Sequence, residues 1–135
     1  MTTVYQQTNN TSVNLLGSPT VVVRLRVPNT GTYLLLGRTA ISLPAPAVGQ
    51  PGGTARAFLT TLDGATVLDE VDVVFAPSIG QVCIALQGTL NVTATNSNEI
   101  VDIRILSGNG FGQALFCSLI AISVDQLSGS LLSGT

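Results

Sequence analysis

Apolar and polar residues alternate with a period of two along much of the chain, and no stretch keeps a 3.6-residue period for the length of a helix. The clearest case runs from Thr20 to Val27, where alternate residues are apolar and Val22, Arg24 and Arg26 occupy the opposite face. This alternation predicts a half-buried β-strand with one side toward solvent. The pattern as a whole predicts an all-β protein.

Turn residues divide the chain into eight such segments. Pro28 to Gly31 and Asp63-Gly64 are typical turn sequences, and Asp-Gly in particular favours a tight hairpin. The expected strands are Val4 to Thr8, Thr20 to Val27, Thr32 to Leu43, Thr54 to Leu62, Ala65 to Val74, Gln81 to Ala94, Glu99 to Leu106 and Gly112 to Val124. This spacing is typical of an antiparallel two-sheet jelly-roll sandwich of about eight to ten strands.

The length favours one domain. We expect residues 1–127 to form it and the Ser/Gly-rich residues 128–135 to form a flexible tail.

Two of the expected strands are apolar on both faces. Leu34, Leu35 and Leu36 follow one another, and in the last strand Leu115 and Cys117 share one apolar face while the alternate residues form another. In a sandwich one face of a strand meets the other sheet, so a second apolar face needs a further cover. The cover could be another copy of the chain or the Pro-rich loop at 44–53. Charged residues make up only 9% and the mean hydropathy is +0.50, which favours a subunit interface.

Short motifs in these strands resemble one known family. The segment Val27 to Leu36 resembles the "proline, turn, Gly-x-Tyr, apolar run" of the third strand in tumour necrosis factor-like and complement component 1q-like jelly rolls. Phe116 to Ile122 resembles the final strand of that family, with an aromatic residue, a small residue and an aliphatic run. Leu62-Asp63-Gly64 falls where the family often has a hairpin with a glycine turn.

The resemblance implies an assembly as well as a fold. It implies a jelly roll that packs as a compact homotrimer around a three-fold axis lined by apolar and aromatic side chains. Carried over by position, it implies that Leu34, Leu36 and Phe116 face this axis. Tyr33 and Cys117, which have the opposite parity, would then point into the sandwich core.

The composition removes most of the usual catalytic groups. The chain has no His, and all five of its basic residues are Arg, so it has no Lys either. His is the side chain that titrates near neutral pH, and Lys is the usual amine nucleophile. The spacing of the seven acidic residues singles out no pair for acid–base catalysis. We therefore expect no enzymatic activity, no catalytic residue and no cofactor.

The cluster from Asp69 to Asp72 could be a calcium site, but it lacks the spacing of a calcium-binding loop. A solvated strand end that discourages edge pairing is the favoured interpretation, so no metal site is expected. Cys83 and Cys117 lie in apolar segments. Buried thiols are favoured for them, and a disulfide between them is the alternative.

The distribution of charged and apolar residues also limits the partners and the location that we expect for this protein. The five Arg residues are scattered singly, so we expect no nucleic-acid binding. No run of about 18 apolar residues is present, so we expect no membrane insertion. Residues 1–14 lack the features of a signal peptide, which predicts a cytoplasmic protein or one exported by a non-classical route.

These observations favour a non-catalytic structural or recognition module that forms a homotrimer and contacts a ligand through exposed loops. Asn91, Asn96 and Asn98 lie at a polar loop tip, where neutral hydrogen bonds to a glycan or a protein ligand could form. Three copies of a weak contact would act together. The alternatives are a carbohydrate-binding module with a discrete site in each subunit and a shell- or capsid-type building block.

Overall fold

The computed structural model of the 135-residue chain describes residues 2–43, 53–61, 64–74, 81–93, 99–108 and 110–124. Within these ranges there are nine strands and no helix. The strands are β1 (Val4–Asn9), β2 (Val13–Asn14), β3 (Thr20–Val27), β4 (Gly31–Ser42), β5 (Thr54–Thr61), β6 (Thr66–Val74), β7 (Gln81–Val92), β8 (Glu99–Ser107) and β9 (Gln113–Val124). All eight expected strands are confirmed, and the two-residue strand β2 is an addition to them. The expected tail at 128–135 lies outside the described residues.

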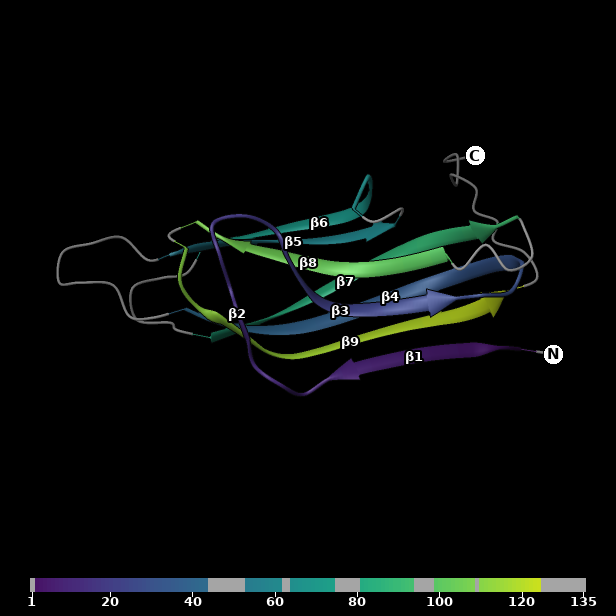
Figure 1. Ribbon diagram of the computed structural model, residues 1–135, viewed down its shortest axis with the longest axis horizontal. Helices are drawn as coiled ribbons and strands as arrows, with labels where there is room; N and C mark the ends of the chain where they lie inside the picture. The colour runs from purple at the N-terminus through teal and green to yellow at the C-terminus, as the bar shows by residue number, and fades with distance from the viewer. Residues whose placement is uncertain are drawn as a thin grey trace, which may run out of the picture.

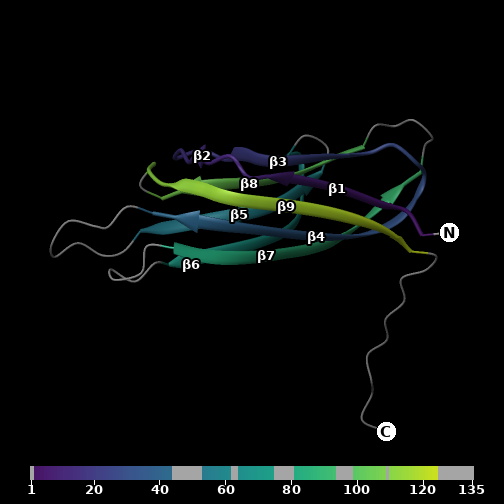
Figure 2. The same cartoon turned by 90° about the horizontal axis from the view of Figure 1, so that it is seen from below.

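The strands form two antiparallel sheets that pack face to face (Figures 1 and 2). The five-stranded sheet has the order β1-β9-β4-β7, and β2 also pairs with β9. The four-stranded sheet has the order β3-β8-β5-β6. Strands far apart in sequence are neighbours here, since β4 lies between β9 and β7 and pairs with each of them along most of its length. The architecture is an antiparallel two-sheet jelly-roll sandwich.

The core lies between the sheets and is made by the inward face of each strand. Tyr33 and Cys117 are both buried there, which confirms the predicted parity of β4 and β9. The Tyr33 hydroxyl donates a hydrogen bond to the carbonyl oxygen of Asn29 at 3.0 Å, so the buried ring keeps its polar end satisfied. The largest fully buried aliphatic side chains are Leu15, Val22, Val27, Leu35, Ile41, Leu59, Val101, Ile103, Ile105 and Leu119.

Irregular pairing in two strands overturns two expectations about which way side chains point. The register between β4 and β9 shifts between Ala40 and Ile41, which leaves Leu115 as an extra residue in β9. Because of this bulge Ala114, rather than Leu115, is fully buried on the inward face. A similar shift in β3 buries Val22, although the alternation placed it with Arg24 on the solvent side.

The predicted hairpin turn is present between β5 and β6, whose ends pair through Thr61 and Thr66. Gly64 has φ +87°, a conformation that favours glycine, while Leu62 and Asp63 lie outside the described residues. A Cβ atom on Gly64 would lie 2.7 Å from the guanidinium carbon of Arg104. Gly64 therefore lies close against the side chain of Arg104, where a larger residue would not fit without a shift.

Candidate functional site

The side of the five-stranded sheet that faces away from the core is the strongest candidate for a functional surface, and we call it the outward face. Its members follow from the register of β1, β9, β4 and β7, because residues that pair across an antiparallel sheet point to the same side. In the middle of the sheet these residues are Val4, Gln6, Thr8, Leu34, Leu36, Arg38, Ala40, Cys83, Ala85, Gln87, Thr89, Phe116, Ser118, Ile120 and Ile122.

All three residues predicted to face a three-fold axis lie on the outward face. Leu34 pairs with Ile122 and Leu36 pairs with Ile120, so β4 and β9 place four aliphatic side chains next to each other. Leu36 is 38% exposed, a large fraction for a leucine in a central strand. Phe116 pairs with Ala40 and is separated from these four side chains by the pair of Arg38 and Ser118. The role of these residues at an axis stays a prediction, while their common exposure on one face is a feature of the fold.

The outward face is hollowed near its centre. The hollow has a volume of about 350 Å³ and brings Leu36 and Phe116 together with polar side chains from three strands. It is lined by Gln6, Thr8, Leu36, Gly37, Arg38, Phe116, Ser118 and Ile120. The guanidinium carbon of Arg38 lies 5.4 Å from the centroid of the Phe116 ring, within the range of a cation–π contact.

Charge is distributed unequally between the two sheets. Among the described residues, Arg38 is the one charged side chain in the five-stranded sheet. The other described charged residues all belong to the four-stranded sheet and are Arg24, Arg26, Arg56, Asp69, Glu70, Asp72, Glu99, Asp102 and Arg104. One side of the sandwich is therefore strongly hydrated, and the opposite side is mostly apolar.

The acidic cluster of β6 forms ordinary surface contacts. β6 is an edge strand, as expected for a segment whose charges discourage further pairing. Arg56 contacts both Glu70 at 3.2 Å and Asp72 at 2.9 Å, and Asp69 accepts a hydrogen bond from the backbone N–H of Gln87 at 2.9 Å. Within the described ranges no group of three His, Cys, Asp or Glu residues is placed to hold a metal ion.

The two cysteines differ, and one expectation about them was wrong. Both are free thiols, and Cys117 is buried as predicted. Burial raises the pKa of the Cys117 thiol, and a hydrogen bond with the Thr39 hydroxyl at 3.1 Å opposes that rise. Cys83 is exposed, because it pairs with Ala40 and therefore shares the outward face rather than the core.

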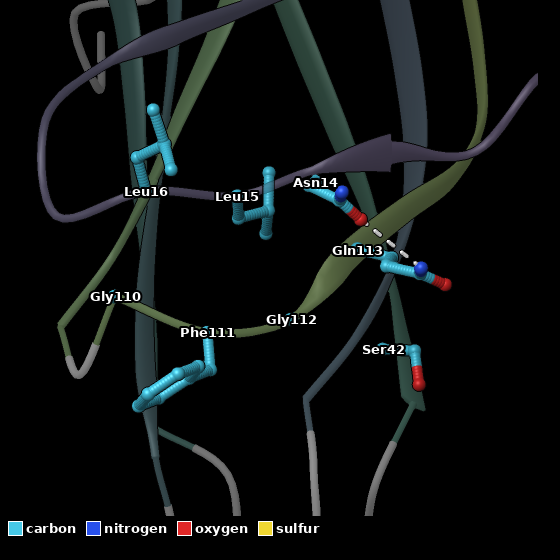
Figure 3. Close-up of a pocket in the computed structure, with 8 residues that line it drawn as sticks. All are labelled: Asn14, Leu15, Leu16, Ser42, Gly110, Phe111, Gly112 and Gln113. Carbon is cyan, nitrogen blue, oxygen red and sulfur yellow. Dashed lines mark hydrogen bonds between the residues drawn. The ribbon is translucent and has the colours of Figure 1, made fainter.

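A second hollow, of about 550 Å³, lies at one end of the sandwich where β2 meets the start of β9 (Figure 3). The amides of Asn14 and Gln113 are joined there by a hydrogen bond of 3.1 Å, and the side chains of Leu16 and Phe111 are exposed. The Pro-rich loop at 44–53, the alternative cover expected from the sequence, lies outside the described residues except at Gly53.

The asparagines predicted to bind a ligand are placed only in part. Asn91 is exposed on β7, where its side-chain oxygen accepts a hydrogen bond from the Thr32 hydroxyl at 2.8 Å. Asn96 and Asn98 lie outside the described residues. Asn91 pairs with Thr32, whereas the end hollow adjoins the Ser42–Gln113 pair, so the two sites lie at opposite ends of β4.

The sequence reasoning missed the polar part of the outward face. Thr8, Ser118 and Arg38 form one row across β1, β9 and β4, because Ser118 pairs with both of the others. The signal was present in the sequence, since Arg38 has the same parity as Leu34 and Leu36. The prediction for this face included only apolar residues, so Arg38 was left out of it.

Comparisons with known proteins identify the fold. No family model matches the chain, and no characterised protein matches its sequence. In structure it is similar to an Eiger TNF from S. frugiperda, with 12% identity over 96% of this chain and 98% of that one, at a TM-score of 0.59. It is also similar to murine APRIL, with 12% identity over 89% and 98% of the two chains at a TM-score of 0.54.

A third similar structure is the globular domain of the zebrafish complement 1qA protein, with 9% identity over 93% and 98% of the two chains at a TM-score of 0.54. The chain therefore has the jelly-roll fold found in tumour necrosis factor-like and complement component 1q-like domains. The described part of the chain also contains no helix of the length and hydrophobicity needed to cross a membrane.

Proposed function

We propose that this chain is a non-catalytic structural or recognition module that assembles as a homotrimer through the outward face. The observation that carries the proposal is the group of large apolar side chains at the centre of that face, in β4 and β9. Contiguous apolar patches on folded proteins mark interaction sites. Complete burial of one such side chain contributes about 1.5–3 kcal/mol, so a shared interface would stabilise the assembly substantially.

The distribution of charge supports this choice of face. The four-stranded sheet presents paired charges to solvent and would lose their hydration in an interface, whereas the outward face has one charged residue among those described. A three-fold arrangement joins two different patches on each copy and closes into a ring. The motif resemblance in β4 and β9 and the similarity in fold both favour three copies over two.

Ligand contacts in this proposal come from loops at the ends of the sandwich. Rigid β scaffolds commonly present binding residues on such loops. The candidates are Asn96 and Asn98, in the segment that follows β7, together with Asn91, which lies near the end of β7 itself, with a glycan or a protein as the ligand class. Three equivalent sites on one trimer would bind a multivalent partner together, which can raise the overall affinity by about 10²–10⁴ without any further contact.

Thiol labelling tests whether the outward face is covered. Cys83 lies on this face and is exposed in the subunit, so a maleimide reagent reaches it unless another copy covers it. We expect labelling of Cys83 in the assembled protein to be slower by about tenfold or more than after dilution into single chains. Cys117 is the internal control, because it is buried and its raised pKa keeps the thiol protonated.

The labelling experiment can also contradict the proposal. Labelling of Cys83 at the rate of an exposed peptide thiol at every protein concentration would show that the outward face is open to solvent. Rapid labelling of Cys117 in the same sample would indicate unfolding, so the two residues separate dissociation of the assembly from loss of the fold.

A further inference from the structure

Arg38 carries a charge on the outward face, whose other described residues are uncharged. It is the one charged residue described there, and its strand neighbours on that face are Leu36 and Ala40. The residue that pairs with it on β7 is Ala85. No hydrogen bond or ion pair joins the side chain of Arg38 to another described residue, and its guanidinium lies over the Phe116 ring.

The polar side chains that line the same hollow as Arg38 are suited to an anion. Ser118 pairs with Arg38 on β9, and Thr8 pairs with Ser118 on β1, so the three lie in one row across neighbouring strands. Neighbouring strands are about 4.8 Å apart. All three residues line the hollow of about 350 Å³, together with the amide of Gln6. Hydroxyl, amide and guanidinium groups can all donate hydrogen bonds, and the guanidinium adds a positive charge.

The described carboxylates already have other partners in their own subunit. Asp102 contacts Arg24 and Arg104, and Glu70 and Asp72 contact Arg56. Asp69 accepts hydrogen bonds from the backbone N–H groups of Glu70 and Gln87, and Glu99 accepts one from the Thr61 hydroxyl. All five belong to the four-stranded sheet. The other two acidic residues, Asp63 and Asp125, lie outside the described residues.

We propose that Arg38 residues from three copies bind one small oxyanion, such as phosphate or sulfate, between the subunits, with Ser118 and Thr8 beside them. This inference rests on the proposed trimer. Burial of three guanidinium groups among apolar side chains is costly unless a negative charge accompanies them. Arg forms strong charge-assisted hydrogen bonds with oxyanions, often through two parallel N–H donors.

The geometry of the ligand matches that of the assembly. A tetrahedral oxyanion has a three-fold axis of its own, so three of its oxygens can each face an equivalent Arg38. The contact with the Phe116 ring holds the guanidinium of Arg38 beside an aromatic residue that the trimer proposal places at the axis. The site is incomplete in a single chain, where the hollow opens to solvent on the outward face.

The stoichiometry of bound anion tests the inference. The protein is dialysed against radiolabelled phosphate in sodium chloride, and bound phosphate and native mass are measured on the same sample. We expect one phosphate for every three chains. Replacing chloride by phosphate at equal ionic strength should raise the melting temperature of the trimer by about 2–4 °C, because a ligand that binds only the folded state stabilises it.

Arg38→Gln provides the matched control, because it removes the charge and keeps a polar side chain of similar length. This variant should bind no phosphate, and phosphate should raise its melting temperature less than that of the parent, which separates the site from general salt effects. A trimer with no bound phosphate, or with one phosphate for each chain, would overturn the shared site and leave the proposed trimer standing. A native mass of one chain would overturn both proposals.

Discussion

Replacing Leu34 by Asp should dissociate the proposed trimer into folded single chains. Leu34 lies on the outward face and is partly exposed in the subunit, so a carboxylate is hydrated there as long as the face is open. Leu34 does not line the hollow that contains Arg38, so in the trimer three carboxylates would be enclosed among apolar side chains, where unpaired charge costs several kcal/mol. We expect association to weaken by at least about a thousandfold, equivalent to about 4 kcal/mol.

The same change elsewhere on the surface provides the control. Val67 on β6 is 52% exposed and belongs to the four-stranded sheet, so Val67→Asp should leave the assembly intact. Sedimentation velocity at several concentrations would compare the two variants with the parent, and Ile122→Asp, at the position that pairs with Leu34, should behave like Leu34→Asp. If both outward-face variants sediment as stable trimers, these residues do not lie in a subunit interface.

Replacing Asp102 by Asn should lower the free energy of unfolding by about 3 kcal/mol. Asp102 is 1% exposed and lies on β8, with Oδ1 2.7 Å from Nε of Arg24 and Oδ2 2.9 Å from a terminal nitrogen of Arg104. Arg104 is itself only 20% exposed, so removal of the carboxylate takes a close, charge-assisted contact away from a largely buried guanidinium. That loss is larger than the attraction between hydrated charges.

Asp72→Asn tests whether burial is the cause. Asp72 also contacts an arginine, since its Oδ1 lies 2.9 Å from Nε of Arg56, but these side chains are 59% and 50% exposed. Exposed pairs of this kind contribute about 0–1 kcal/mol, so the loss should be small. Urea unfolding followed by circular dichroism at one fixed protein concentration measures both variants. Equal losses would show that the buried network around Asp102 has no special role in stability.

The alternation of residues predicted much of this fold because it reports directly on which side of a strand faces the core. The two apolar faces of β4 are visible in Leu34, Leu35 and Leu36, and the structure places Leu35 in the core and the other two on the outward face. The family resemblance, which placed Leu34, Leu36 and Phe116 at an axis, implied by parity the burial of Tyr33 and Cys117, and this burial is confirmed. These inferences needed no knowledge of which strands pair.

The incorrect predictions concern features that depend on pairing. At the bulges at Val22 and Leu115, one extra residue reverses which side of the sheet the following side chains face. A bulge depends on the partner strand as well as on the local sequence, so alternation alone does not reveal it. Cys83 was assigned by residue type, although it pairs with Ala40 on the outward face. The row formed by Thr8, Ser118 and Arg38 comes from three strands that are distant in sequence, so only the register brings it together.

The most direct test of the proposed assembly is the absolute native mass of the parent protein, measured by light scattering as it leaves a sizing column. The outward face, with its apolar centre in β4 and β9, predicts a mass equal to three chains across the elution peak. A mass equal to one chain at the same concentrations would contradict the trimer, the multivalent contacts and the oxyanion site shared by three copies.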